Sequence, residues 1–278
     1  MLIQDIVKIL TDAGIEQNEA NVEVKLLIEH FAGYSLVDIL MGKKLDEEKL
    51  KLVEEKAKLR ASSRQPIQYI IGLADFMGEK FLVSKDVLIP RDETEILVQK
   101  SVEIISENNF KRAIDMCTGS GCIACMIAKL TDCQVIGTDI STEAIHVAFS
   151  NMERFKLFNK ATFRKSDLYS KIRDEEKFDI IVSNPPYISP QMKATIQKEV
   201  SFEPDLALYT QDDKGLEFYE QIIKGAPKVL NKGGYLLFEL GLGQSKDVAE
   251  IMSETGFEKI QVVKDLANID RVIWGKLK

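Results

Sequence analysis

The sequence predicts a two-part α/β protein, in which a small helical bundle precedes a doubly wound, mainly parallel sheet of the Rossmann-like class. Three observations carry this prediction. The chain has 278 residues, enough for one large domain or two modest ones. Its first 60 residues show helical periodicity, whereas strands and helices alternate from about residue 92. Ser, Pro and Gly residues interrupt the chain between these two parts. We therefore expect a helical domain at 1–70, a hairpin linker at 71–90 and the α/β domain at 91–278.

The first 90 residues predict helices followed by a hairpin. Apolar side chains recur every three or four residues at 6–10 and again at 24–31. The acidic run 46–48 marks the start of a longer helix, because acidic residues are favoured in a first turn. Segment 76–83 has apolar residues on both sides of Gly78 and predicts a hairpin that turns there.

The rest of the chain alternates between strands and helices. The expected elements are a helix at 93–107, a strand at 113–116, an apolar helix from 122, a strand at 134–139, a helix from 141, strands at 161–164 and 178–183, a long loop and helix, a strand at 234–239, a helix from 244, and strands at 259–263 and 271–274. Strands separated by helices form parallel sheets, whose ligands bind at the carboxyl ends of the strands. Site residues are therefore expected where the strands end.

Composition argues against membrane and nucleic-acid partners. Apolar residues make up 45% and charged residues 29% of the chain, as in ordered globular proteins. No uncharged apolar run approaches about 18 residues, and the N-terminus lacks the pattern of a secretory signal, so we expect a cytoplasmic protein without a membrane partner. The 37 basic and 44 acidic residues give a net charge of −7. Stable nucleic-acid binding is therefore not expected.

Four cysteines lie close together, at 117, 122, 125 and 133. The first three have the C-x4-C-x2-C spacing of plant-type iron–sulfur ligands. The same stretch also has the apolar pattern of a buried helix, in which free cysteine packs as a small hydrophobic residue. We favour the helix and expect no metal; the iron and zinc content of the purified protein decides between the two.

A glycine-containing turn connects the first strand of the predicted sheet to the next helix. Gly119 and Gly121 allow backbone amides to approach a ligand closely. The following strand ends in Asp139, whose carboxylate can accept hydrogen bonds from ribose hydroxyls. A dinucleotide site is compatible with this spacing, with Ala124 at the sixth position. An S-adenosylmethionine site is favoured by Asp115, an acidic residue that precedes the glycines.

The third strand is followed by Asp167 and Leu168, which can read the edge of an adenine. The alternative for Asp167 is a helix cap or a solvated turn residue.

The fourth strand is followed by Asn184, Pro185, Pro186 and Tyr187. Two prolines fix the backbone and lack N–H groups, so the Pro185 carbonyl is expected to point outward as an unpaired acceptor. The Asn184 amide adds an acceptor beside it, and Tyr187 supplies a flat face. Together they can bind both hydrogens of a planar –NH2 group and orient its nitrogen toward a methyl sulfonium, so that positioning supplies much of the catalysis. A rigid loop without a ligand is the alternative.

The combination of these motifs resembles the HemK/PrmC-type protein glutamine-N5 methyltransferases, and most closely their release-factor branch. The resemblance covers nearly the whole chain, and its most specific segments are 64–72, 88–95, 115–124, 184–187, 203–204, 233–234, 238–239 and 270–272.

The resemblance implies a seven-stranded class I methyltransferase domain and an N-terminal helical domain that recognises the protein substrate. It implies transfer of a methyl group from S-adenosylmethionine, which leaves as S-adenosylhomocysteine, to the glutamine of the Gly-Gly-Gln loop in peptide chain release factors. The cofactor residues it implies are Cys117, Thr118, Gly119, Ser120, Gly121, Asp139, Asp167, Leu168 and Asn184. The substrate residues are Asn184, Pro185, Pro186 and Tyr187, of which Asn184, Pro185 and Tyr187 are the catalytic set.

Two positions depart from the family pattern. Cys117 stands where many members have glycine, and Asp92 stands where proline is usual. The cysteine-containing version of the turn resembles the sister branch that acts on a ribosomal protein. Because cysteine disfavours positive φ, we expect an ordinary negative φ at Cys117.

Three other functions share part of the pattern. The first is methylation of a ribosomal-protein glutamine. The second is methylation of adenine N6 in nucleic acid, which shares the Asn-Pro-Pro-Tyr motif but predicts a basic groove and a flipped base. The third is cofactor binding without catalysis, against which the intact Asn184 and Tyr187 argue.

Overall fold

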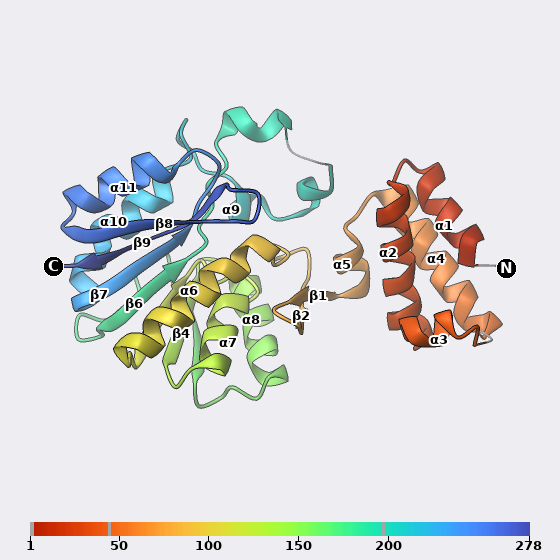
Figure 1. Ribbon diagram of the computed structural model, residues 1–278, viewed down its shortest axis with the longest axis horizontal. Coiled ribbons are helices and arrows are strands. Elements are labelled where there is room, and N and C mark those ends of the chain that lie inside the picture. Colours follow the sequence, from red (N-terminus) through yellow and green to blue (C-terminus); the bar gives the residue numbers. More distant parts are fainter. Residues whose placement is uncertain (1–2, 44–45, 196–197) are drawn as a thin grey trace. The chain divides into compact units, whose positions relative to one another are not determined.

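The computed structural model divides the chain into two units, which Figure 1 colours from the red N-terminus to the blue C-terminus. The structure describes residues 3–43, 46–195 and 198–278. The smaller unit is Met1–Leu73 with Gln197–Phe202, and the larger unit is Ala74–Ile196 with Glu203–Lys278. Four residues of the predicted helical domain, 1–2 and 44–45, lie outside the described residues.

The smaller unit is helical, as its periodicity predicts. Its elements are α1 (Ile3–Asp12), α2 (Gln17–Leu27), the π-helical turn η1 (Ile28–Ala32), α3 (Leu36–Leu40), α4 (Glu47–Ser63) and α5 (Ile67–Ile71). The apolar stripes of α1, α2 and α4 form a core of their own, in which Ile6, Leu10 and Leu27 are fully buried. The acidic run starts α4 as predicted, because the Asp46 carboxylate accepts hydrogen bonds from the Glu48 and Lys49 amides.

A buried arginine holds a distant segment of the chain in the smaller unit. Arg60 on α4 has 1% of its side chain exposed and pairs with Glu23 at 2.9 Å. It also pairs at 3.3 Å with Glu199 of the short helix η3 (Lys198–Phe202). Arg64 reaches the same Glu199 carboxylate at 2.7 Å. These ion pairs explain why residues 198–202 belong to the helical unit.

The larger unit begins with a hairpin and continues with alternating strands and helices. Its elements are β1 (Leu73–Phe76), β2 (Glu79–Leu82), α6 (Asp92–Asn108), β3 (Arg112–Met116), α7 (Cys122–Leu130), β4 (Gln134–Asp139), α8 (Thr142–Arg154), β5 (Ala161–Lys165), β6 (Phe178–Ser183), η2 (Pro190–Thr195), α9 (Asp205–Leu208), α10 (Glu217–Val229), β7 (Leu230–Glu239), α11 (Ser245–Glu254), β8 (Phe257–Lys264) and β9 (Asp270–Leu277).

Seven of these strands form one twisted sheet in the order β5-β4-β3-β6-β7-β9-β8. Strands β3 to β7 pair in parallel, and β9 pairs antiparallel with both β7 and β8. The predicted fold class, a mainly parallel seven-stranded sheet with a helical N-terminal part, is confirmed. The strand order reverses between β3 and β6, and ligands of open α/β sheets bind at such a point.

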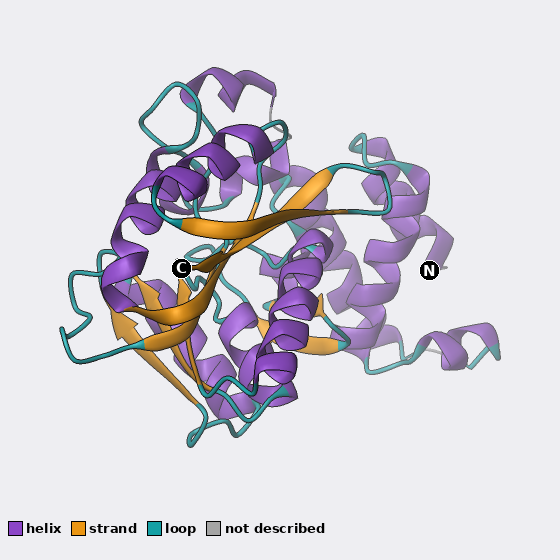
Figure 2. Cartoon of the chain, turned by 60° about the vertical axis from the view of Figure 1, so that its left-hand side comes forward, coloured by secondary structure: helices purple, strands orange, loops and turns teal. Residues whose placement is uncertain are grey.

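Helices cover both faces of the sheet (Figures 1 and 2). One core contains residues of α6 and α7, such as Leu97 and Ile127, and the other contains residues of α10 and α11, such as Ile222 and Val248. Because both faces are covered, the central strand β6 is buried along nearly its whole length rather than at alternate residues. Within the described ranges, the helices lack the length and apolar content that crossing a bilayer requires.

The hairpin that we expected as a linker packs into the larger unit. Phe76 and Phe81 belong to its core, with ring centroids 5.8 Å apart. The buried Asn151 side chain on α8 exchanges two hydrogen bonds with the Leu82 backbone, at 2.7 and 2.9 Å. Residues 74–90 are therefore placed with the α/β unit rather than between the two units.

Candidate active site

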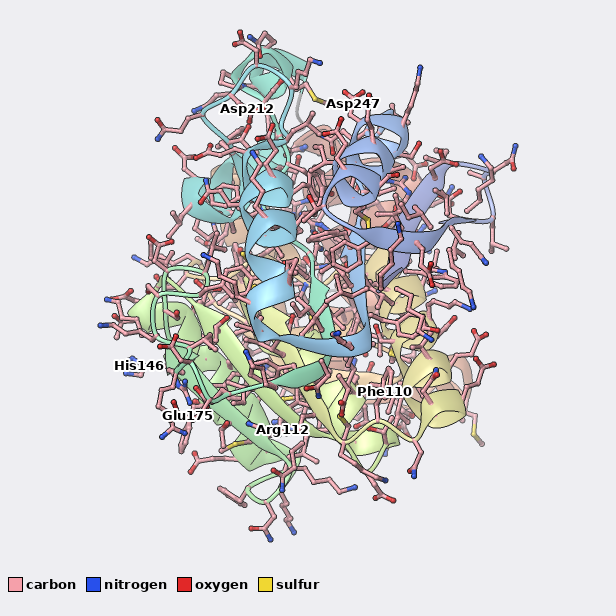
Figure 3. All side chains as sticks on the ribbon, turned by 90° about the vertical axis from the view of Figure 1, so that its left-hand side faces the viewer. Phe110, Arg112, His146, Glu175, Asp212 and Asp247 are labelled. Atoms are coloured by element: carbon pink, nitrogen blue, oxygen red, sulfur yellow. The ribbon has the colours of Figure 1, made fainter. Side chains whose placement is uncertain are left out.

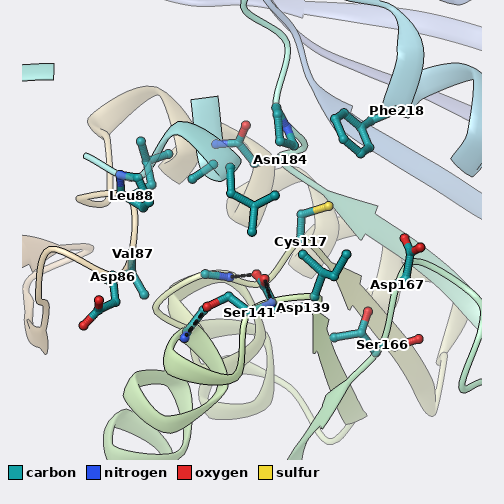
Figure 4. A pocket seen from close by; sticks show the side chains of 18 of the residues that line it. Asp86, Val87, Leu88, Cys117, Asp139, Ser141, Ser166, Asp167, Asn184 and Phe218 are labelled. Carbon is teal, nitrogen blue, oxygen red and sulfur yellow. Dashed lines mark hydrogen bonds between the residues drawn. The ribbon is translucent and has the colours of Figure 1, made fainter. Parts of the chain in front are cut away.

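The carboxyl ends of β3, β4, β5 and β6 surround one pocket in the larger unit (Figure 4). Seven of the predicted site residues line it: Cys117, Gly119, Asp139, Asp167, Leu168, Asn184 and Pro186. Segment 86–88 before α6 and segment 204–207 around α9 add further walls. No motif in the sequence indicates a cofactor role for these two segments.

The other five predicted residues lie beside the pocket rather than in its lining. Thr118 and Ser120 are buried residues of the glycine turn itself, and Gly121 precedes α7. Pro185 is buried, and Tyr187 packs against the core on the α10 face of the sheet. Within the described ranges, no group donates a hydrogen bond to the Pro185 carbonyl oxygen, which keeps its acceptor capacity.

Asp115 stabilises the glycine turn through hydrogen bonds. Its Oδ2 accepts hydrogen bonds from the Thr118 hydroxyl at 2.5 Å and from the Ala124 amide at 3.1 Å. Burial raises the pKa of Asp115 to about 7. The acidic residue before the glycines therefore supports the loop and does not line the pocket.

The two glycines of the turn serve different purposes. Gly119 has φ of 54° and a Cβ there would meet no atom within 4 Å, because it faces the pocket. Gly121 has φ of 77° and a Cβ there would lie 2.9 Å from Ala148 Cβ on α8. Gly119 leaves room for a ligand, whereas Gly121 allows α8 to pack closely.

The expectation of a negative φ at Cys117 is wrong, because the structure gives φ of 58°. The loop must turn sharply to bring the Thr118 amide to the Thr138 carbonyl on the neighbouring strand, 2.9 Å away. That turn uses the left-handed region, which costs a non-glycine residue roughly 1–2 kcal/mol. Glycine at this position in many family members fits the same backbone without that cost.

We expect Cys117→Gly to keep its affinity for the cofactor within a few-fold of the wild type. We also expect its free energy of unfolding to be higher than that of Cys117→Ala. Both variants remove the thiol, but only glycine adopts the positive φ without strain. The free energy of unfolding of Cys117→Gly is therefore expected to exceed that of Cys117→Ala by about 1 kcal/mol. Urea unfolding and calorimetric titration with S-adenosylhomocysteine measure the two quantities. A large loss of affinity in both variants would mean instead that the thiol packs against the cofactor.

Asp139 connects the first two loops of the pocket. Its Oδ2 accepts a hydrogen bond from the Gly119 amide and its Oδ1 accepts one from the Ser141 amide, each at 2.9 Å (Figure 4). Each carboxylate oxygen keeps a lone pair for a ligand hydroxyl. Burial raises the pKa of Asp139, while these backbone hydrogen bonds lower it.

Asp167 and Leu168 form the wall after β5. The Asp167 amide donates to the Ser170 hydroxyl at 3.1 Å, so this N–H already has a partner in the protein. The Asp167 side chain is exposed and lines the pocket. The Asp167 carboxylate is thus one group of this segment that could accept hydrogen bonds from an adenine.

Asn184 lies between the pocket and a buried polar cluster that the sequence analysis missed. Its Nδ2 donates to Thr94 Oγ1 at 3.3 Å. Thr94 Oγ1 donates to Glu239 Oε2 at 2.5 Å, and the Tyr187 hydroxyl donates to Glu239 Oε1 at 3.4 Å. Thr94 and Glu239 come from α6 and the end of β7. The available signal was a glutamate that ends an apolar strand, since a buried carboxylate needs partners.

The charge of the pocket favours a cationic cofactor over a dinucleotide. Its lining includes the carboxylates of Asp86, Asp139 and Asp167, and among the described residues no Lys, Arg or His lines it. A pyrophosphate would be repelled by these carboxylates, whereas the sulfonium and ammonium groups of S-adenosylmethionine would be attracted. The residues present therefore fit S-adenosylmethionine better than a dinucleotide.

Neither histidine lines this pocket. His146 lies on the exposed surface of α8 and His30 is exposed on η1 (Figure 3 labels His146).

The cysteines near the pocket are poor nucleophiles. Burial raises the pKa of the Cys117 thiol, which disfavours the reactive thiolate. Cys122 and Cys125 pack on α7 as buried apolar residues.

Two family models match the chain. One, described as the methyltransferase small domain, matches residues 92–201, and the other, described as the PrmC N-terminal domain, matches residues 1–72.

Curated relatives match over most of the chain. The release factor glutamine methyltransferase of Fusobacterium nucleatum is 40% identical over 238 residues, which are 85% of this chain and 67% of the relative. The release factor glutamine methyltransferase of Geobacter sulfurreducens is 37% identical over 272 residues, which are 96% of this chain and 93% of the relative.

Solved structures resemble the fold. The hMettl16 catalytic domain, in complex with MAT2A 3′UTR hairpin 6, superimposes with a TM-score of 0.59 at 18% identity, over 81% of this chain and 82% of that chain. At this identity the likeness concerns the fold alone.

Proposed function

The chain belongs to the release factor glutamine methyltransferases, and from this membership we propose that it methylates the glutamine of the Gly-Gly-Gln loop in a peptide chain release factor. The methyl donor is S-adenosylmethionine and the product is S-adenosylhomocysteine. The observation that carries the proposal is the position of the 184–187 turn, whose Asn184 and Pro186 line a pocket that is rich in carboxylates.

The residues that would hold the cofactor lie at the carboxyl ends of the parallel strands. Asp139 would accept hydrogen bonds from the ribose hydroxyls, and Asp167 would read the adenine. The open space over Gly119 would leave room for the methionine part. When bound, the cofactor supplies an electrophilic methyl group on a sulfonium.

The turn after β6 would hold the substrate. Asn184 Oδ1 and the Pro185 carbonyl oxygen would each accept one hydrogen of the glutamine –NH2 group. Two acceptors fix the plane of the amide and aim its nitrogen into the pocket, which is the positioning that a weak nucleophile requires. Tyr187, tethered through its hydroxyl to Glu239, would pack beside the amide.

The direct test is incubation of the protein with S-adenosylmethionine and a purified release factor, followed by intact-mass measurement. We expect the addition of a single methyl group, and no addition to a release factor whose Gly-Gly-Gln glutamine is replaced by alanine. If the release factor gains no methyl group while a ribosomal protein or a nucleic acid does, the proposed methyl-accepting substrate is wrong.

We also propose that the helical unit recognises the release factor. It has its own core, and several of its apolar side chains, including Val22, Val37 and Met41, are more than half exposed. Deletion of residues 1–70 is expected to abolish methylation while S-adenosylhomocysteine still binds, because every described residue that lines the pocket belongs to the larger unit. Full activity of the truncated protein would contradict a docking role.

A further inference from the structure

The carboxylate of Glu239 is buried behind the substrate-binding turn. It ends β7, which pairs with β6, so Glu239 lies beside the residues that follow β6. Its exposed fraction is 3%, and it does not line the pocket. Both of its oxygens are used, one by Thr94 and the other by Tyr187. Glu239 thus contacts Thr94, the partner of Asn184 before the two prolines, and Tyr187 after them, without lining the pocket.

The direction of these hydrogen bonds determines how the Asn184 amide faces. An ionised carboxylate can only accept, so the single hydrogen of the Thr94 hydroxyl points to Glu239. Thr94 Oγ1 then offers only lone pairs to Asn184, and Asn184 Nδ2 lies 3.3 Å away as the donor. With Nδ2 held toward Thr94, Oδ1 is the end of the amide that is turned away from Thr94, and Asn184 itself lines the pocket. The two ends of an asparagine amide have nearly the same shape, so these partners alone distinguish them.

We infer that Glu239 is a positioning residue that acts through Thr94 to make Asn184 present its oxygen, and not its NH2 group, to the substrate amide. This inference rests on the proposed function. An outward oxygen attracts the hydrogens of a glutamine –NH2, whereas an outward NH2 would repel them. The same arrangement selects against a substrate side chain that has no hydrogens to donate, such as a glutamate carboxylate.

The charge state of Glu239 controls this orientation. Burial and, to a smaller extent, the nearby Glu93 carboxylate raise the pKa of Glu239, while Thr94, Tyr187 and Arg271 lower it, and the balance is a pKa of about 7. A protonated Glu239 can itself donate to Thr94, which frees the Thr94 hydrogen to point at Asn184 and removes the preference. The other titratable groups that face Glu239 are Cys122 on α7 and Tyr219 on α10. Both thiol and phenol stay neutral near pH 7, because burial raises their pKa values.

The kinetic test compares Thr94→Val with Thr94→Ser. Valine keeps the shape of threonine but removes the hydroxyl, whereas serine keeps the hydroxyl. We expect Thr94→Val to lower kcat about 10-fold with unchanged affinity for S-adenosylhomocysteine, and Thr94→Ser to stay within about threefold of the wild type. Equal turnover of Thr94→Val and the wild type would overturn the inference. The affinity measurement shows at the same time that each variant is folded.

The spectroscopic test does not depend on methyl transfer. In the full-length protein, the side-chain amide resonances of Asn184, identified by their loss in Asn184→Ala, are followed by NMR as a function of pH. We expect them to shift with a midpoint near pH 7 in the wild type and not in Glu239→Gln. Absence of the shift in the wild type, or its persistence in Glu239→Gln, would contradict the inference. Failure of the wild type to methylate any release factor would instead contradict the proposed function.

Discussion

Replacement of Asn184 by alanine is expected to abolish methyl transfer and to leave most cofactor binding intact. The substitution removes Oδ1, one of the two acceptors that would hold the substrate amide, and leaves the Pro185 carbonyl as the only other one. Loss of one preorganised hydrogen-bonding group at a reacting centre costs about 100-fold or more in kcat. Most of the pocket lining, including Asp139, is unchanged, so affinity for S-adenosylhomocysteine should fall by no more than a few-fold.

Single-turnover kinetics with a release factor and calorimetry with S-adenosylhomocysteine separate these two effects. Asn159→Ala is the matched control, because Asn159 is exposed and lies before the amino-terminal end of β5, whereas the pocket lies at the carboxyl ends of the strands. The control should behave as the wild type in both assays. Unchanged turnover of Asn184→Ala would show that Asn184 does not hold the substrate.

Replacement of Asp139 by asparagine is expected to give the opposite pattern, a large loss of cofactor affinity. The carboxylate accepts hydrogen bonds from the Gly119 and Ser141 amides, and asparagine must turn an NH2 group toward one of these donors. It also loses the charge that would strengthen the bonds to the ribose hydroxyls. Hydrogen bonds to a charged group contribute about 1.5–3 kcal/mol each, so weakening of the two ribose bonds predicts a decrease in affinity of at least about 100-fold.

Calorimetry with S-adenosylhomocysteine measures this loss directly, and turnover at saturating cofactor should recover much of the wild-type kcat. Asp132→Asn makes the same chemical change at a side chain that is 88% exposed, and it should leave affinity unchanged. Tight binding by Asp139→Asn would mean that the ribose lies elsewhere in the pocket.

The order of the elements could be predicted because it depends on local pattern. Apolar periodicity, the acidic start of α4 and the turn at Gly78 each act over a few residues, and the structure has all three where they were expected. The strand ends that surround the pocket follow from the same pattern, because parallel strands place their carboxyl ends at one edge of the sheet. Seven of the predicted site residues therefore meet in one pocket.

The features that the sequence did not reveal depend on contacts between distant segments. The hydrogen bond between Thr94 and Glu239 joins residues 145 positions apart, and no local spacing indicates it. The positive φ of Cys117 is imposed by the neighbouring strand rather than by the cysteine itself. Residues 74–82 of the hairpin belong to the larger unit, where Asn151, a residue far along the chain, binds the hairpin backbone at Leu82.

Fragmentation mass spectrometry of the Gly-Gly-Gln peptide, after reaction of the release factor with the wild-type protein, locates the transferred methyl group. We expect a single methyl group on the side-chain nitrogen of the glutamine, because Asn184 and Pro185 would present that nitrogen to the pocket. A methyl group on another residue, or on a backbone atom, would contradict the proposed function.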